Sequence, residues 1–516
     1  MESVPPLDGV DSDALDRAWQ PVFRWAEKAP EAVALVDPDH TLTYRQFADA
    51  IADAAARLQH HGVRAGDRIL IVGENTVATV ICFFAAEYID AWPAITNARM
   101  TAHEIGVMRA TVGARLVVFT IEHSDAAAGH AALEPVTEEA SPAWGGILVG
   151  RADRATRPPP AVPLPVAAMI FTSGTTGKPK AAMLGHRGLL FMGRTTARTR
   201  GATAADAFYG TPPMAHVMGI LVLMMVVLSG ARLKLVPRLE LADLAASIRD
   251  HSISYITCVP TVYSRLLDYA ASQKFNLSDN GIRMLVSGGA PLDPNLKVRV
   301  ETAFARRLSN GYGLTESTPV LTTRVDGPDA PAESVGYPYQ GVDVRIVNAE
   351  GKDVAPGESG EIWIRSPANM LGYFEQPDET AKVIRDGVWY TTGDLARYLP
   401  DGQVAIVGRA KEMIIRSGFN VYPAEVEAAI NAHPSVVQSA VVSRPATDGN
   451  EAVVAYVQLS AGETTIGEDE LRRHLVERLA PYKRPEELVI LASLPIGPTG
   501  KVWKQKLREM AAGTPT

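Results

Sequence analysis

Residues 172–180, Thr-Ser-Gly-Thr-Thr-Gly-Lys-Pro-Lys, are the stretch that decides the fold, because they concentrate hydroxyls, glycines and cations in nine positions. Gly174 and Gly177 allow a tight turn that brings backbone N–H groups close to a ligand. The hydroxyls and lysines add donors and positive charge, which suits a polyphosphate. The preceding apolar run 166–171 indicates a buried strand, so the loop leaves a strand end, where ligands of α/β proteins usually bind. The alternative is a solvated polar turn.

The spacing of this loop differs from that of a Walker loop. Two residues, not four, separate Gly174 from Gly177, and Pro179 follows Lys178 where Ser or Thr should stand. The sequence therefore predicts a phosphate-binding loop of another kind.

Composition restricts the class of protein. The 516 residues predict about three or four domain-sized units. With 47% hydrophobic and 21% charged residues, the chain has an ordinary globular composition. A net charge of −8 and the lack of a long basic run argue against a nucleic-acid partner. Anion binding must therefore depend on local cations.

Cysteine content and hydropathy indicate the compartment. Cys82 and Cys258 are the only cysteines, and both lie in apolar runs, so packing explains them better than catalysis. Two cysteines suit a reducing cytoplasm, and the N-terminus lacks a signal-peptide pattern. The longest apolar run, 217–228, is shorter than the about 20 residues that a bilayer requires. We expect a cytoplasmic protein without an integral membrane segment.

The order of apolar segments predicts an α/β fold with doubly wound sheets. Helical spacing at 42–60 is followed by a strand at 68–73 and a helix at about 76–88. The Ala-, Glu- and Pro-rich stretch 124–165 is interpreted as loop and connector. Strands and helices then alternate again as far as about residue 286, which is typical of doubly wound sheets.

Two further units are predicted downstream. Short alternating strands with Gly-rich turns indicate a smaller β-rich unit at about 336–408. After Arg409 we expect a compact α+β end-piece, with helices at 423–431 and 468–479 and strands at 436–442 and 452–459.

Four clusters besides the loop carry candidate chemistry. Ser287–Pro291 is another Gly-rich turn after a predicted strand. Asn310–Glu316 combines an aromatic ring that can stack on a base with a carboxylate that can bind Mg²⁺. Tyr390–Asp394 ends in a carboxylate, the usual partner of ribose hydroxyls. Lys501 lies at the tip of a Pro/Gly loop that cannot be helical. Taken singly, each is also compatible with a solvated surface turn.

In their order along the chain, these clusters resemble the signatures of the AMP-forming adenylating enzymes, which include acyl-CoA synthetases, firefly-type luciferases and adenylation domains of peptide synthetases. The resemblance runs from about Leu42 to Leu507. The matching motifs are Thr172–Lys180, Asn310–Glu316, Tyr390–Asp394, Gly408–Glu412 and Pro495–Lys501. The resemblance implies a large N-terminal adenylation domain at 1–409, a hinge at 410–412 and a mobile C-terminal lid domain at 413–516.

The resemblance also implies how ATP and Mg²⁺ would bind. The 172–180 loop would wrap the β- and γ-phosphates, Asp394 and Arg409 would hold the ribose, and Glu316 with Thr172 would bind Mg²⁺. The full set of implied ATP-binding residues is Thr172, Ser173, Gly174, Thr175, Thr176, Gly177, Lys178, Gly288, Gly289, Ala290, Asn310, Gly311, Tyr312, Gly313, Thr315, Asp394 and Arg409.

Catalytic roles are implied for Lys501, His216, Glu316 and Thr172. Lys501 would bridge the substrate carboxylate and the α-phosphate, because a fixed cation between two approaching anions lowers the barrier to their reaction. His216 occupies the position of the family's acyl-site histidine, although by its surroundings alone it would be a packed core residue. No protein nucleophile is required, since the substrate oxygen attacks first and a thiol second.

The second half-reaction implies a moving lid. Lys411 would be the hinge, because residues at element ends absorb backbone rotation most easily. CoA, as co-substrate, would enter a tunnel lined by Ser417, Gly418, Phe419 and Asn420.

The expected acyl pocket is mostly apolar. Its predicted residues are His216, Val217, Met218, Gly219, Val222, Tyr263, Gly289, Leu314 and Ser317. The 217–228 helix carries no cation to pair with a second carboxylate, so a fatty or aromatic monoacid is favoured over a malonate-like diacid. Nor does an aspartate head the 214–219 segment, where amino-acid-activating relatives usually keep one.

Three hypotheses follow. The favoured one is an AMP-forming acid–CoA ligase that uses a small carboxylic acid, ATP and CoA. The second loads the acyl group onto the phosphopantetheine of a separate carrier protein. The third is a nucleotide-binding sensor without catalysis, which the intact Lys501, Glu316 and Lys178 argue against. The sequence leaves the oligomeric state open, with a homodimer as one option.

Overall fold

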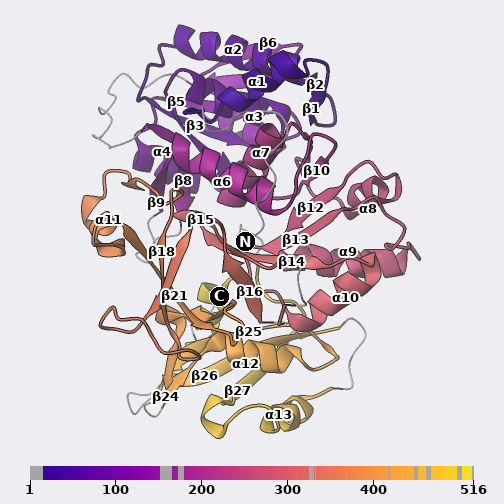
Figure 1. The fold of residues 1–516 in the computed structure, drawn as a ribbon, viewed down its shortest axis with the longest axis vertical. Helices are drawn as coiled ribbons and strands as arrows, with labels where there is room; N and C mark the ends of the chain where they lie inside the picture. Colours follow the sequence, from indigo (N-terminus) through magenta and orange to yellow (C-terminus); the bar gives the residue numbers. More distant parts are fainter. Residues whose placement is uncertain are drawn as a thin grey trace.

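Two large sheets and a small C-terminal unit make up the molecule (Figure 1). In this view the N-terminal elements lie at the top and the elements after residue 410 at the bottom. The expected α/β fold with a large N-terminal part and a smaller C-terminal part is confirmed. The structure, a computed structural model, describes residues 15–150, 165–172, 179–324, 330–331, 333–416, 419–446, 451–460, 466–496 and 502–513.

The first sheet has the strand order β19–β9–β8–β4–β3–β5–β7–β6. Its centre is parallel, while β6, β7, β9 and β19 pair antiparallel toward the two edges. Helices α2 and α3 pack on one face and α4 and α5 on the other, since their apolar residues belong to two separate cores. The bounds are α1 Gln20–Lys28, α2 Tyr44–His60, β3 Arg68–Gly73, α3 Val77–Tyr88, β4 Trp92–Asn97, α4 Ala102–Val112, β5 Leu116–Thr120, α5 Asp125–Ala131, β6 Val136–Ser141, β7 Gly145–Gly150, β8 Val166–Thr172, β9 Lys180–Gly185 and β19 Gly372–Tyr373.

The second sheet is longer, in the order β17–β18–β21–β22–β16–β15–β14–β13–β12–β10–β11–β1–β2, with β20 beside β21. Strands β10 to β14 run parallel, with α8, α9 and α10 on one face. Helices α6 and α7 lie between the two sheets and share one core with both. The bounds are β1 Val33–Val36, β2 Thr41–Thr43, α6 His186–Thr199, β10 Ala207–Gly210, α7 Val217–Ser229, β11 Arg232–Leu235, α8 Leu241–Arg249, β12 Tyr255–Cys258, α9 Pro260–Ser272, β13 Met284–Gly288, α10 Pro294–Phe304, β14 Leu308–Leu314 and β15 Ser317–Thr322.

The β-rich unit expected at about 336–408 is antiparallel and has a core of its own. It is not a separate sheet, however. Strand β16 pairs with β15 on one side and β22 on the other, so one ladder of hydrogen bonds continues from the parallel part into this unit. The bounds are β16 Ser334–Pro338, β17 Asp343–Val347, β18 Gly360–Arg365, α11 Pro377–Val383, β20 Ile384–Arg385, β21 Trp389–Tyr398 and β22 Val404–Arg409.

The expectation of loop and connector over 124–165 is wrong as far as residue 150. Helix α5 and the hairpin β6–β7 occupy this stretch, and the hairpin extends the first sheet beyond β5. Trp144, in the turn of the hairpin, is fully buried and donates its indole N–H to Asp53 Oδ2 at 3.0 Å. Strand β6 lies at the edge of the sheet and is exposed over most of its length, so its sequence shows no alternation of apolar and polar residues.

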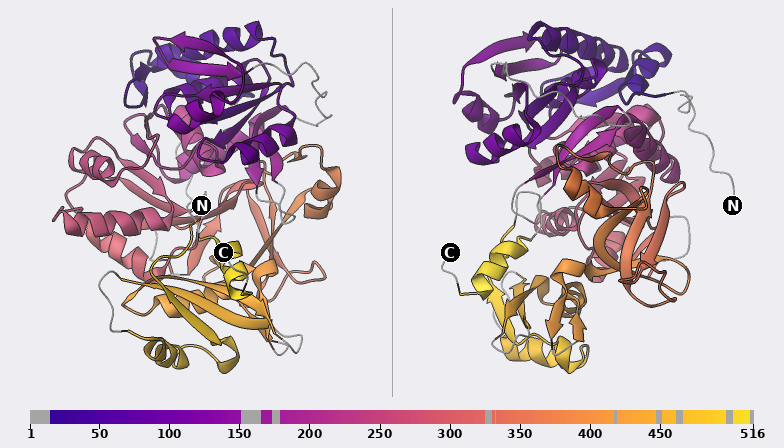
Figure 2. Two further views of the ribbon diagram at one scale, coloured as in Figure 1. Left: turned by 180° about the vertical axis from the view of Figure 1, so that it is seen from behind. Right: turned by 90° about the vertical axis from the view of Figure 1, so that its left-hand side faces the viewer.

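The C-terminal unit is a three-stranded sheet with helices on both faces (Figure 2). Helices α12 and α13 pack against one face and α14 against the other, because the apolar residues of each strand alternate between two cores. No helix within the described ranges is long and apolar enough to cross a membrane. The bounds are η2 Ala410–Glu412, β23 Ile414–Arg416, β24 Phe419–Val421, α12 Pro423–Asn431, β25 Val436–Pro445, β26 Glu451–Leu459, α13 Glu468–Val476, η3 Pro481–Lys483, β27 Glu487–Leu491 and α14 Lys504–Ala511.

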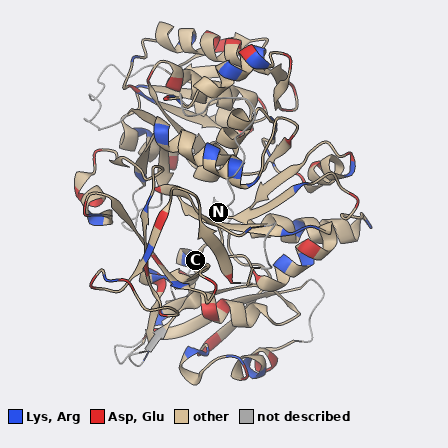
Figure 3. Ribbon diagram, in the orientation of Figure 1, with Lys and Arg blue, Asp and Glu red and all other residues tan. Residues whose placement is uncertain are grey.

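Charged residues of both signs are interspersed over the described elements (Figure 3). Helices such as α10 and α13 carry lysine or arginine beside aspartate or glutamate rather than a face of one sign. Such interspersed charge differs from the clustered basic face that is typical of nucleic-acid-binding proteins.

Candidate active site

The predicted ribose-binding aspartate lies at the centre of a hydrogen-bonded trio. Asp394 of β21 is 4% exposed, and its Oδ2 accepts from the Tyr312 hydroxyl at 2.6 Å. Its Oδ1 forms an ion pair with Arg409 Nε at 3.0 Å, across the β21–β22 ladder. Burial and the neighbouring Asp394 carboxylate raise the pKa of Tyr312 well above its ordinary value, so the phenol stays protonated and donates. Residues from β14, β21 and β22 thus meet at one place.

Glu316 lies in the turn between β14 and β15. Its Oε1 accepts from the Tyr373 hydroxyl at 2.8 Å, and its backbone carbonyl accepts from Met370 N–H at 2.8 Å. Burial and the Glu316 carboxylate raise the pKa of Tyr373 and of Tyr390. Glu316 thus accepts a hydrogen bond from one phenol and lies near a second.

The two sheets converge on this carboxylate. Thr172, at the end of β8, is paired with Lys180 on β9. The Lys180 ammonium lies 4.8 Å from the Tyr373 ring centroid and forms an ion pair with Glu379 of α11. Tyr373 therefore links the edge of the first sheet to the β14–β15 turn of the second.

Carboxyl ends of two parallel strands supply a floor without side chains. Gly288 of β13 pairs with Gly311 of β14, and an added Cβ on Gly288 would lie 3.4 Å from the Gly311 carbonyl. Asn310 is fixed beneath it, since its Nδ2 donates to the Ser334 carbonyl at 3.1 Å. Gly289 has φ of 77°, a conformation that favours glycine. Ala290 and Gly313 extend the same two segments. An added Cβ on Gly288 or Gly311 would be in ordinary van der Waals contact with neighbouring atoms.

His216 is positioned at the N-cap of α7. Its Nδ1 accepts from the backbone N–H of Met218 at 3.3 Å, which orients the imidazole at the helix start. The next turn is tight, because a Cβ on Gly219 would lie 2.2 Å from the Pro213 carbonyl oxygen. Only glycine fits there.

Asn75, which the motifs did not reveal, holds the segment before His216. Its Nδ2 donates to the carbonyls of Gly210 and Pro212 at 3.0 Å each, and its Oδ1 accepts from Met214 N–H at 2.8 Å. The amide is buried, so it satisfies three backbone groups that water does not reach. An isolated Asn after a strand gives no sequence signal for such a role.

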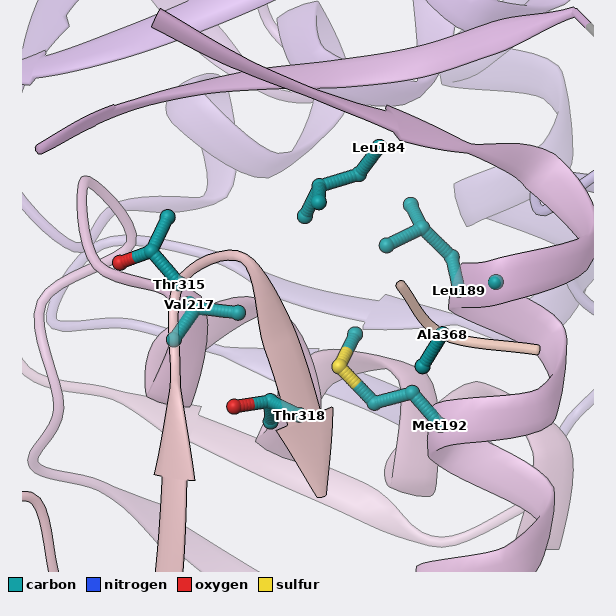
Figure 4. A pocket seen from close by; sticks show the side chains of 8 residues that line it. Leu184, Leu189, Met192, Val217, Thr315, Thr318 and Ala368 are labelled. Atoms are coloured by element: carbon teal, nitrogen blue, oxygen red, sulfur yellow. The ribbon is translucent and has the colours of Figure 1, made fainter. Parts of the chain in front are cut away.

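A small apolar pocket opens beside the predicted acyl residues (Figure 4). Val217 and Thr315 border it on one side of this view, and Leu189 and Met192 of α6 border it on the other. Thr315 thus lines a largely apolar space as well as lying beside Glu316. The lining residues are Leu184, Gly188, Leu189, Met192, Val217, Thr315, Thr318 and Ala368.

Not all predicted acyl residues come together. Tyr263 of α9 is fully buried in the core on the far face of β12 and β13, where its hydroxyl donates to backbone carbonyls. Val222 is 2% exposed within α7, and Ser317 is fully buried at the start of β15. Leu314 packs partly buried against the core of the antiparallel unit. Met218 and Gly289 do lie together, with the Met218 Cε 3.7 Å from where a Gly289 Cβ would be.

The predicted hinge lies in the one-turn segment η2, immediately after Arg409. Burial and the nearby Arg409 charge lower the pKa of Lys411. Its neighbour Glu412 pairs with Lys504 at 3.3 Å, and Lys504 pairs also with Glu427 at 2.8 Å. Helix α14 is thus tied to the hinge by a partly buried ammonium group.

Several predicted residues fall outside the described ranges, namely Ser173, Gly174, Thr175, Thr176, Gly177, Lys178, Ser417, Gly418 and Lys501. Phe419 and Asn420 begin β24, which pairs with β23.

Both predicted metal ligands lie within the described residues. The described residues contain no group of three or more His, Cys, Asp or Glu side chains arranged as a metal site. Glu316 and Thr172 nevertheless offer a carboxylate and a hydroxyl, the hard oxygen donors that Mg²⁺ prefers. This donor set fits an ion that takes its remaining ligands from phosphates and water.

The chain belongs to the AMP-binding enzyme family. The model of the AMP-binding enzyme family matches residues 22–374, and that of the AMP-binding enzyme C-terminal domain matches residues 425–501. A feruloyl-CoA synthase of Amycolatopsis sp. is 32% identical over 494 residues, covering 94% of this chain and 97% of that protein. The 3-[(3aS,4S,7aS)-7a-methyl-1,5-dioxo-octahydro-1H-inden-4-yl]propanoyl:CoA ligase of Rhodococcus jostii is 31% identical over 512 residues, with the same coverage.

A solved structure shares the whole fold. ATP-bound MatB from Rhodopseudomonas palustris superposes with a TM-score of 0.85 at 28% identity, covering 96% of this chain and 99% of MatB. The resemblance inferred from the sequence motifs is thereby confirmed.

Proposed function

We propose that this chain is an ATP-dependent acid–CoA ligase, which activates a carboxylic acid as acyl-AMP with release of pyrophosphate and then transfers the acyl group to CoA. The observation that carries the proposal is the meeting of Glu316 and the Tyr312–Asp394–Arg409 trio at the carboxyl ends of β13 and β14. Names of both relatives describe acyl–CoA ligation. Their similarity over nearly the full chain supports the same reaction class here.

Each part of the site has a task in this reaction. Asp394 is proposed to accept hydrogen bonds from ribose hydroxyls, and Ala290 and the Tyr312 ring are proposed to border the base. Glu316 and Thr172 are the proposed ligands of Mg²⁺, which supplies charge compensation for the phosphates when bound. We keep Ser173–Lys178 as the proposed phosphate loop and Ser417–Asn420 as the proposed CoA tunnel.

Lys501 is the proposed catalytic cation. Two unit charges about 4 Å apart interact by roughly 4 kcal/mol at an effective dielectric constant of about 20. If that attraction is made in the transition state, it corresponds to about a thousandfold in rate. We also propose that the N-terminal domain ends at residue 409 and that the lid domain begins at residue 413. Lys411 is the proposed hinge, about which the lid rotates so that Lys501 leaves the site and the face that binds the thiol of CoA replaces it.

We further propose an acid with a bulky apolar body. Support comes from the apolar lining around Val217 and Met192 and from the ring-bearing acyl groups in the names of both relatives. A linear fatty acid is the alternative substrate. Both cysteines are free and buried, which suits work in a reducing cytoplasm.

One experiment tests the reaction class. The purified chain is incubated with ATP, Mg²⁺ and a panel of linear, aromatic and fused-ring acids, with either CoA or a phosphopantetheinylated carrier protein, and AMP and thioester are measured. We expect AMP and acyl-CoA in equal amounts. If AMP forms only with the carrier protein, the acceptor is the carrier protein and not CoA. If no acid yields AMP, the proposal is refuted.

A further inference from the structure

An arginine without a partner lies inside the N-terminal part. Arg200, the C-cap of α6, is 8% exposed, and its Nε and Nη1 are buried without a hydrogen-bond partner. The described residues include no carboxylate in an ion pair with it. Taking an unpaired guanidinium out of water is costly, and such a group normally pairs with an anion or a strong acceptor. The guanidinium of Arg200 is therefore a candidate to bind an acceptor on a ligand.

The guanidinium lies over the glycine floor described above. Its Nη2 would be 3.5 Å from a Cβ added to Gly311, and the Met218 sulfur would be 3.7 Å from one added to Gly288. Gly288 and Gly311 are paired in register on adjacent parallel strands, so their missing side chains point to the same face of the sheet. Arg200 of α6 and Met218 of α7 thus both contact the glycine-bearing face of these two strands.

Arg200 approaches the glycine floor from the amino ends of the strands. The Arg200 carbonyl accepts from the hydroxyl of Tyr255, the first residue of β12, at 2.6 Å. Arg283, just before β13, donates from Nη2 to the Gly201 carbonyl at 2.7 Å. The end of α6 is therefore anchored at the amino ends of these strands, opposite the carboxyl ends where Glu316 lies.

A second orphaned polar group faces the same way. Thr257 is 3% exposed and its Oγ1 is buried without a hydrogen-bond partner. It pairs with Val286, which lies two residues before Gly288, so its side chain shares the face of the glycine floor. Buried polar groups are nearly always satisfied. Two exceptions on one face of an otherwise apolar site match the few polar groups that orient a ligand.

We propose that Arg200, assisted by Thr257, is a specificity residue that binds an oxygen acceptor at the end of the acid remote from its reacting carboxylate. This inference rests on the proposed function, because the remote end is defined by the carboxylate reacting near Glu316. The 217–228 helix carries no cation, as the sequence predicts, but Arg200 at the end of α6 supplies one from a different element. The acid it selects is an apolar ring or chain that ends in a ketone, a phenol or a second carboxylate.

The test compares acids that differ only at the remote end. Phenylpropanoate is compared with its para-hydroxy derivative. Heptanoate is compared with 6-oxoheptanoate, which carries an uncharged acceptor at the remote end, and with heptanedioate, which carries a carboxylate there. For wild type we expect kcat/KM to favour the oxygen-bearing acid at least about tenfold, because a site built to hydrogen-bond a group rejects the analogue without it.

Variants assign the preference to its residue. Arg200→Met should abolish the preference, use the plain acid within about threefold of wild type and melt no lower than wild type, because a buried unpaired charge is removed. Thr257→Val should weaken the preference. Arg187→Met, on the exposed face of α6, makes the same charge change and should keep the preference.

Contrary outcomes separate the two proposals. Equal use of paired acids by wild type, or an equal fall with both acids in Arg200→Met, would overturn the role of Arg200 and leave the ligase assignment intact. The rise in melting temperature caused by each acid with AMP requires no turnover, so it tests Arg200 even if CoA proves to be the wrong acceptor. A rise that is the same in Arg200→Met and wild type would also overturn it.

Discussion

Asn75 fixes the approach to His216, so its loss should separate acid use from ATP use. Asn75→Ala removes three buried hydrogen bonds, to the carbonyls of Gly210 and Pro212 and from Met214 N–H. At about 1 kcal/mol each, the N-terminal part should lose roughly 3 kcal/mol. For a domain of several hundred residues this corresponds to a melting temperature about 4 °C lower.

Kinetics give the functional part of this prediction. The segment that carries His216 loses its anchor, and misplacement by a fraction of an ångström lowers kcat/KM for the acid roughly tenfold. The KM for ATP should change little, since the Asp394 trio makes no contact with Asn75. Steady-state AMP release with either substrate varied measures both values, and differential scanning fluorimetry measures the melting temperature.

A matched variant controls for stability alone. Asn280→Ala removes a comparable set, in which Asn280 donates to the Leu277 and Phe304 carbonyls and accepts from Ile282 N–H, away from the candidate site. It should lower the melting temperature yet leave both KM values unchanged. If the two variants alter kcat/KM for the acid equally, or neither alters it, Asn75 does not position His216.

Four further predictions concern the site and the core. Lys501→Ala should slow acyl-AMP formation about a thousandfold, and an equal loss of thioester formation from pre-made acyl-AMP would make its role structural. Lys411→Pro should keep pyrophosphate release and lose thioester, with Lys411→Ala keeping both; normal thioester turnover in the proline variant would exclude the hinge. Asp394→Ala leaves Arg409 and the Tyr312 hydroxyl without their acceptor, so the KM for ATP should rise at least about tenfold while the KM for the acid stays constant. An equal rise in both KM values would show that Asp394 does not bind the nucleotide. Glu87 is fully buried with neither carboxylate oxygen partnered, and burial raises its pKa well above 4.5. The folded protein therefore holds a proton that the unfolded chain releases, so its free energy of unfolding falls as pH rises above 4.5. Glu87→Gln should therefore melt higher than wild type near neutral pH, with the gap closing toward pH 4.5; a gap independent of pH would contradict this.

The sequence was sufficient for much of the fold because the apolar runs are short and well separated. The strand at 68–73 and the helix at 423–431 have the predicted bounds, since each is flanked by turn residues. The hairpin β6–β7 was missed because its outer strand is solvated and lacks a strong pattern. Continuity between the parallel and antiparallel parts depends on β16 pairing on both sides, a long-range hydrogen-bond choice that local sequence does not encode.

The candidate site was predictable where chemistry is concentrated in motifs. Asp394, Arg409 and Tyr312 come from three motifs and meet within hydrogen-bond distance. Tyr373 and Asn75 were missed because single polar residues outside motifs look ordinary in a sequence. Tyr263 was assigned to the acyl pocket by its position in the chain, yet α9 packs on the far face of the sheet.

The central claim is that the acid attacks the α-phosphate of ATP, and isotope transfer tests it most directly. The acid is labelled with heavy oxygen in its carboxylate, the full reaction with CoA is run, and AMP is analysed by mass spectrometry. The account predicts that each AMP carries one labelled oxygen from the carboxylate. AMP without the label, or ADP in place of AMP, would contradict it.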